Sequence, residues 1–201
     1  MPLEVIIDRY VRRGIDCIAV TDHDKIEGAL EMQKIAPFKV IVGEEVKTVQ
    51  GEIIGLFLTE RIPPLLTAEE TIERIHKQGG LTCVPHPFDR IRGGRLKEEV
   101  LEELHQSIDV MEAFNSRTTL LRDSDKARAF GKAKDKPLGA GSDSHTPIEI
   151  GGAYVEMADF EGPDDFLNCL RQGRIVGRRA NPLVHVPTRI VRTLKKLRGI
   201  Y

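Results

Sequence analysis

Residues with metal-binding side chains recur at five places along the chain, each at the end of a short apolar run. The five segments are Thr21-Asp22-His23-Asp24, Gly43-Glu44-Glu45, Val84-Pro85-His86-Pro87, Phe114-Asn115 and Gly141-Ser142-Asp143-Ser144-His145. Imidazoles suit Zn²⁺, Mn²⁺ or Fe²⁺, whereas carboxylates bridge two ions or bind harder ones. Ions held by such a mixture supply a hydroxide nucleophile at neutral pH and hold phosphoryl oxygens.

Secondary-structure patterns predict how these segments are positioned. β-branched runs predict strands over 17–20, 39–42, 81–84, 108–113, 137–140 and 153–157, and a hairpin over 46–58 with Gly51 near its turn. Helical periodicity and end signals predict helices over 3–13, 28–34, 67–76, 97–105, 119–133, 164–172 and 189–197. This alternation is typical of an α/β fold with parallel strands. Because the carboxyl ends of barrel strands share one mouth, the five motifs are predicted to line one cavity.

Each motif alone also has a plainer interpretation. A histidine after an apolar strand is often structural, Pro85-His86-Pro87 can be a rigid turn, and Glu44 and Glu45 can be a solvated loop. Asn115 can cap a helix, and Asp143 with His145 can form a capping turn. Recurrence at five successive strand ends favours a shared site. Three other histidines, in predicted helices or the tail, are interpreted as structural: His76, His105 and His185.

Composition favours one soluble domain. The 201 residues are 40% apolar and 30% charged, without a stretch long and apolar enough to span a membrane or a secretory signal, so a cytoplasmic protein is expected. We expect a single domain, with a barrel over about 1–180 and a basic tail over 181–201. Residues 171–201 contain nine Lys or Arg and no Asp or Glu. The widely spaced Cys17, Cys83 and Cys169 are interpreted as buried free thiols rather than a disulfide or metal site.

In their order, the five motifs resemble those of the PHP (polymerase and histidinol phosphatase) family over about residues 1–180. The resemblance implies a distorted seven-stranded (β/α) TIM-like barrel and two or three divalent ions, Mn, Zn, Fe or Mg, that hydrolyse phosphoesters. The metal ligands that it implies are His23, Glu45, His86, Asn115, Asp143 and His145. Asp143 and His145 are also implied as catalytic residues. Glu45 is preferred to Glu44 by its spacing from the glycine, and Asp22 is expected to orient a histidine.

The family opens with a strand bearing His-x-His and then a Ser-Asp-Gly turn, and neither motif occurs in this sequence. The first residues resemble the helix that follows that turn. A start codon assigned too late, a trimmed fragment and a degenerate homologue are the competing explanations, and the first is preferred because every later motif is intact. As given, the chain is expected to lack the first strand, bind metals incompletely and be poorly active.

Arginines after two of the motifs are candidates to neutralise a phosphoryl group. Arg117 is the preferred catalytic cation, and the alternatives on the loop after His86 are Arg90, Arg92 and Arg95, for which a solvated loop is an equal interpretation. The expected substrate is a small phosphate monoester, such as a nucleotide, or a short RNA or DNA cut by a 5′–3′ exonuclease. A non-catalytic module that binds a phosphorylated ligand or a protein is the alternative. No membrane contact and no obligate protein partner are expected.

Overall fold

The computed structural model describes residues 1–180, in which helices and strands alternate. The helices are α1 (Leu3–Arg12), α2 (Glu27–Ile35), α3 (Ala68–Lys77), α4 (Glu98–Leu104), α5 (Leu121–Ala133) and α6 (Gly162–Gln172), with a 3₁₀ turn at His105–Ser107. The strands are β1 (Cys17–Val20), β2 (Lys39–Lys47), β3 (Glu52–Leu56), β4 (Leu81–Val84), β5 (Val110–Asn115), β6 (Leu138–Gly141), β7 (Ala153–Glu156) and β8 (Arg174–Gly177). The helix predicted over 189–197 lies outside the described residues.

Strands β1 to β6 form one sheet in chain order, with β1 and β6 at its edges. The β1–β2, β4–β5 and β5–β6 pairs are parallel, whereas β3 is antiparallel to both β2 and β4. The predicted hairpin is confirmed, with Gly51 in its turn at φ 144°. The predicted parallel arrangement holds for these other pairs, and β3 departs from it as the returning strand of the hairpin, antiparallel to β4 as well as to β2.

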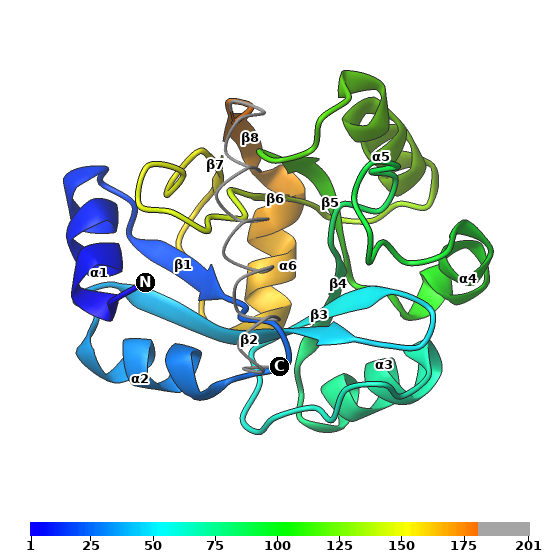
Figure 1. Cartoon of the computed structure of the whole chain (residues 1–201), viewed down its shortest axis with the longest axis horizontal. Coiled ribbons are helices and arrows are strands. Elements are labelled where there is room, and N and C mark those ends of the chain that lie inside the picture. Colours follow the sequence, from blue (N-terminus) through cyan, green and yellow to red (C-terminus); the bar gives the residue numbers. More distant parts are fainter. Residues whose placement is uncertain (181–201) are drawn as a thin grey trace, which may run out of the picture.

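The sheet curls into a half-barrel, with β7 and β8 as a separate antiparallel pair (Figure 1). The predicted α/β fold is confirmed, but the seven-stranded barrel is confirmed only in part. Strand β8 was not predicted, because it has four residues and follows directly on α6. None of the helices described within residues 1–180 has the length and apolar character needed to cross a membrane.

Two apolar layers cover the two faces of the sheet. Outside it, helices α2 to α5 pack on strand residues such as Val42, Val84 and Met111. Helix α6 lies inside the curve (Figure 1). Its Phe166 and Leu170 pack on the alternate strand residues, which are Ile41, Leu56, Leu81, Cys83 and Val110. Successive side chains on a strand point to opposite faces, so each strand contributes to both layers. Helix α6 therefore fills the concave side of the sheet at one end of its strands.

Local signals explain where several elements begin. Thr67 and Glu70 form the predicted capping box, in which the Thr67 hydroxyl accepts a hydrogen bond from the Glu70 amide and the Glu70 carboxylate accepts one from the Thr67 amide. Helix α1 packs Tyr10 edge-on against Phe38, beside the start of β2. The capping box therefore sets the first turn of α3, and the contact between Tyr10 and Phe38 holds α1 beside β2.

Candidate metal centre

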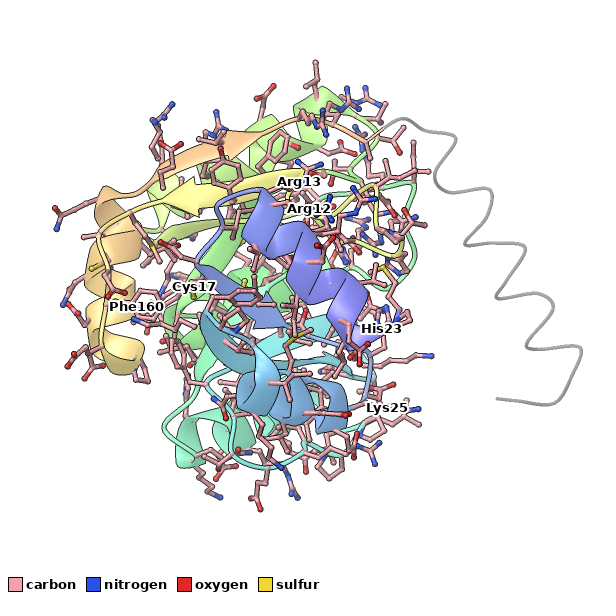
Figure 2. The ribbon with its side chains drawn as sticks, turned by 90° about the vertical axis from the view of Figure 1, so that its left-hand side faces the viewer. Arg12, Arg13, Cys17, His23, Lys25 and Phe160 are labelled. Atoms are coloured by element: carbon pink, nitrogen blue, oxygen red, sulfur yellow. The ribbon has the colours of Figure 1, made fainter. Side chains whose placement is uncertain are left out.

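Alternation along the strands places three carboxylates on the concave face of the sheet. Glu45 of β2, Glu52 of β3 and Glu112 of β5 each lie two or four residues from a strand residue that packs with α6. They therefore share the inner face but lie at the opposite end of the strands. Figure 2 shows the same separation along β1, with Cys17 on the side of Phe160 and His23 at the far end.

Glu45 contacts two histidines that come from different segments. Its Oε2 lies 3.5 Å from Nδ1 of His23, and its Oε1 lies 3.3 Å from Nε2 of His86. The main chain fixes the first contact, because His23 and Glu45 form a parallel bridge. His86 is buried, which alone would lower its pKa, but the hydrogen bond and charge of Glu45 raise the pKa above its ordinary value.

Glu52 joins this group, although the sequence analysis did not single it out. One oxygen each from Glu45 and Glu52 and one ring nitrogen of His23 lie within 4.8 Å of one another, and Glu52 Oε2 lies 3.6 Å from His86 Nε2. Burial and the charge of Glu45 raise the pKa of Glu52. Glu45 pairs with Ile54, which places Glu52 diagonally across on the same face. Two imidazoles and two carboxylates fit a divalent ion such as Mn²⁺, Zn²⁺ or Fe²⁺.

Glu112 connects this group to the remaining predicted ligands. Its Oε2 accepts hydrogen bonds from the His86 amide at 2.6 Å and from Nδ2 of Asn115 at 3.1 Å. Burial raises the pKa of the Glu112 carboxyl to about 7. Gly141 of β6 packs directly on the same carboxyl, since a Cβ there would lie 2.2 Å from Glu112 Oε1. The absence of a side chain at Gly141 makes room for Glu112.

Replacement of Gly141 by alanine should therefore destabilise the protein by about 1–3 kcal/mol, as overpacked cores commonly do. Urea unfolding monitored by circular dichroism would measure the loss. Gly139→Ala on the same strand is the matched control, because its Cβ would lie 3.3 Å from Val110 Cγ1 and 4.0 Å from the Met111 carbonyl oxygen. If Gly141→Ala costs no more than Gly139→Ala, the Glu112 carboxyl is not held against β6.

Asn115, Asp143 and His145 form a second group beside Glu112. Nδ2 of Asn115 lies 3.2 Å from Oδ2 of Asp143, whose Oδ1 lies 3.4 Å from Nδ1 of His145. Contacts therefore run without a break from His23 through Glu45, His86 and Glu112 to His145. Among residues 1–180, however, three possible metal donors lie within 4.8 Å of one another, and they belong to His23, Glu45 and Glu52. The donors of the second group are not part of this cluster.

Two of these residues have left-handed backbone conformations. The φ angle is 32° at His86 and 49° at Asp143, a region that residues other than glycine adopt infrequently. Each lies just beyond the end of a strand, at the turn that carries its side chain toward the concave face. Such conformations cluster at functional sites in proteins.

Arg117 lies beneath the loop that carries Asp143 and His145. Its Nε is 3.1 Å from Oε1 of Glu149, and both side chains are at most 3% exposed. The other Glu149 oxygen accepts hydrogen bonds from the amides of His145 and Thr146. The Arg117 guanidinium also contacts the predicted ligand His145, through Nη1 and the ring Nδ1. Its expected role as a cation for the substrate therefore stays a prediction. Arg117 and Glu149 also hold the loop in place, a pairing that no sequence pattern indicated.

The three arginines after His86 make different contacts. Arg92 forms an ion pair with Asp143, whereas Arg90 pairs with Asp123 of α5 and Arg95 pairs with Glu98 of α4. Burial would raise the pKa of Asp143, but the charge and hydrogen bond of Arg92 lower it overall. Arg92 is thus the arginine of this loop that reaches the candidate site.

Two acidic neighbours of the predicted ligands point elsewhere. Glu44 is fully buried on the outer face, where its Oε2 accepts a hydrogen bond from the Ile62 amide, and burial raises its pKa. The structure therefore places Glu45, not Glu44, against the histidines. Asp22 was expected to orient a histidine, but its carboxylate lies against Gly28 and makes no hydrogen bond to a histidine of the described residues. Its main-chain carbonyl accepts from the Glu45 amide instead.

The residues set aside in the sequence lie away from this site. His76 pairs with Asp109, and His105 contacts the Glu102 carbonyl within the α4 region. His185 lies outside the described residues. All three cysteines are free thiols, as predicted, but only Cys83 is buried and Cys17 and Cys169 are half-buried.

Known proteins resemble this chain in sequence. Residues 122–175 match the family model described as PHP-associated. The uncharacterized protein MJ0417 of Methanocaldococcus jannaschii is 39% identical over 163 residues, which cover 76% of this chain and 65% of that protein. The uncharacterized protein MJ1587 of the same organism is 48% identical over 83 residues, which cover 40% of this chain and 48% of that protein. The chain thus spans from about half to just under two thirds of these relatives.

Solved structures resemble the fold more widely. PsfC from Pseudomonas syringae has a TM-score of 0.69 at 16% identity, covering 94% of this chain and 88% of that one. A two-domain protein from Bacteroides vulgatus, containing a predicted PHP-like metal-dependent phosphoesterase, has a TM-score of 0.66 at 17% identity, covering 88% and 60%. The lesion-specific endonuclease EndoQ from Pyrococcus furiosus has a TM-score of 0.61 at 18% identity, covering 89% and 54%.

The curled sheet with its helices therefore resembles the α/β fold of these solved structures. The PHP-associated family model matches the part of the chain from α5 to the start of β8. The resemblance to the PHP family that the five motifs predicted is confirmed by these findings.

Proposed function

We propose that the concave face binds divalent metal ions and that the chain takes part in metal-dependent hydrolysis of phosphoesters. One observation carries this proposal. The buried carboxylate of Glu45 contacts His23 and His86 and lies beside the second carboxylate of Glu52. Two ionised carboxylates with oxygens within 4.8 Å of each other repel, so their closeness is favourable when a cation lies between them.

The donor set favours ions that accept both nitrogen and oxygen ligands, which are Mn²⁺, Zn²⁺ and Fe²⁺. When bound, such ions supply a hydroxide nucleophile near neutral pH and neutralise phosphoryl oxygens. We assign His23, Glu45, Glu52 and His86 to the first ion-binding group, and Asn115, Asp143 and His145 to a second one beside it. Continuous contacts through Glu112 support a single site.

The remaining polar residues hold these donors in place. Glu112 binds the His86 amide and the Asn115 side chain, so it fixes one donor from each group. Glu149 binds the amides of His145 and Thr146 and is itself held by Arg117. Residues that support metal ligands in this way are worth about 10–100-fold in metal affinity or activity. The substrate is a phosphorylated small molecule or a short oligonucleotide that enters at the exposed side of His23 and His145.

Metal removal and phosphate release test the proposal together. The chain would be stripped with a chelator, reloaded with Mn²⁺ and assayed on a 3′,5′-bisphosphate nucleotide, histidinol phosphate and a short 5′-phosphorylated oligonucleotide. We expect hydrolysis of at least one substrate that chelator abolishes and Mn²⁺ restores. The substrate that is cleaved separates a phosphatase from a nuclease.

Tight Mn²⁺ binding without hydrolysis of any of the three substrates would contradict the enzymatic proposal. That result would favour the non-catalytic module that binds a phosphorylated ligand. Calorimetry with Mn²⁺ alone would supply the binding measurement, so the two outcomes are told apart in one preparation.

A further inference from the structure

The loop after His86 crosses the candidate site as a strap, defined by residues 87–96. One end is tied to the β2–β3 hairpin, where the Glu52 amide donates to the Gly94 carbonyl at 2.7 Å. Leu96 is fully buried there, and a Cβ on Gly51 would lie 2.4 Å from its Cα. The hairpin that carries Glu52 therefore also anchors the strap.

The other end of the strap is held from within and by α5. The carboxylate of the buried Asp89 accepts hydrogen bonds from the amides of Ile91 and Arg92. The Arg90 guanidinium donates to Asp123 of α5 at 3.0 Å. The main chain at Arg92 is thus fixed on both sides, and its side chain is aimed at the concave face.

The Arg92 guanidinium supplies a positive charge to the acidic concave face. It donates through Nη1 to Oδ2 of Asp143, the same oxygen that lies 3.2 Å from Nδ2 of Asn115. The two partners are 20% and 13% exposed, so solvent screens the pair only in part. The charges of Glu45 and Glu112 also act on Arg92. The positive charge of the guanidinium therefore lies at the same carboxylate that would bind a divalent ion.

We propose that Arg92 and a divalent ion compete for the carboxylate of Asp143, and that the displaced guanidinium then binds the phosphoryl group of the substrate. The positive charges of a guanidinium and a divalent ion at one carboxylate repel each other, so binding of one weakens binding of the other. A guanidinium matches phosphate geometry with two parallel hydrogen bonds. This inference rests on the proposed function, because it takes Asp143 as a metal ligand.

Calorimetric titration of the metal-free full chain with Mn²⁺ tests the competition. Arg92→Ala should bind Mn²⁺ about tenfold more tightly than the unsubstituted chain, a typical size for coupling between two binding events. Arg92→Lys keeps the positive charge and should bind Mn²⁺ nearly as the unsubstituted chain does. Arg95→Ala is the matched control, because Arg95 belongs to the same strap but its side chain pairs with Glu98 of α4.

A double-mutant cycle separates competition at Asp143 from a general charge effect. In an Asp143→Asn background, Arg92→Ala should no longer change the Mn²⁺ affinity. For the second half of the inference, inorganic phosphate should bind the Mn²⁺-loaded Arg92→Ala chain about tenfold more weakly than the loaded unsubstituted chain.

Equal Mn²⁺ affinity of Arg92→Ala and the unsubstituted chain would overturn the competition while leaving the proposed function intact. Undiminished phosphate binding by loaded Arg92→Ala would overturn the second role of Arg92. If neither Arg92→Ala nor the unsubstituted chain binds Mn²⁺, this inference and the proposed function are overturned together. If Arg92→Ala binds Mn²⁺ and the unsubstituted chain does not, the result supports the competition.

Discussion

Replacement of Glu45 by glutamine should lower kcat/KM for phosphoester hydrolysis by more than about a hundredfold, since even residues that only support metal ligands are worth about 10–100-fold. Glu45 contacts both His23 and His86 and lies beside Glu52, so its loss removes the donor that joins the first group. Steady-state kinetics with saturating Mn²⁺, together with calorimetry of Mn²⁺ binding, would measure the effect.

The adjacent Glu44 provides a control with nearly the same burial and the same substitution. Its carboxylate points to the outer face and binds the Ile62 amide. Glu44→Gln should leave Mn²⁺ affinity unchanged while affecting stability. Equal activity of Glu45→Gln and the unsubstituted chain would show that the contacts around Glu45 are structural and that the site lies elsewhere.

The metal-free protein should lose stability as the pH rises from about 5 to about 7, because burial raises the pKa of Glu112 to about 7 from a reference value of 4.5. Across this range the unfolded chain ionises Glu112 while the folded chain keeps it protonated. The unfolded state therefore binds fewer protons, and the free energy of unfolding falls with pH by about 3 kcal/mol. Below about pH 4 and above about pH 8 the contribution of Glu112 should be constant.

Urea unfolding in the presence of a chelator, repeated at several pH values, would measure this slope. Glu112→Gln stays neutral and should flatten the profile, with a residual slope of the same sign from the raised pKa values of Glu52 and His86. Glu103→Gln, which changes an exposed carboxylate of α4, should leave the profile as it is. An identical slope in Glu112→Gln would mean that Glu112 is ionised throughout in the folded protein.

Local patterns predicted most of the elements that carry the site. The strands at 17–20 and 81–84 have the predicted bounds, and the capping box at Thr67 begins α3 as expected. These features depend on neighbouring residues alone. His23 and His86 follow the ends of β1 and β4, and Glu45 lies on β2 opposite His23, so their meeting on one face could be anticipated from the order of strands and motifs.

Features that depend on distant pairing were missed or misjudged. The position of β3 between β2 and β4 depends on which strand edge is free when the hairpin returns, and Glu52 enters the site only through that register. The place of Arg117 after Asn115 predicts a role in the site, whereas its contact with Glu149 joins residues far apart in the chain. The contact of Arg92 with Asp143 likewise joins residues that no local pattern relates.

Because His86 and Asp143 have left-handed backbone conformations, the residue type that is best for stability at these two positions differs from the type that the site needs. A glycine would relieve about 1–3 kcal/mol of conformational cost at each turn, yet it would remove an imidazole or a carboxylate from the concave face. Selection for thermal robustness alone would drive both positions toward glycine. A chain that retains histidine and aspartate there gives up stability in order to keep donor atoms.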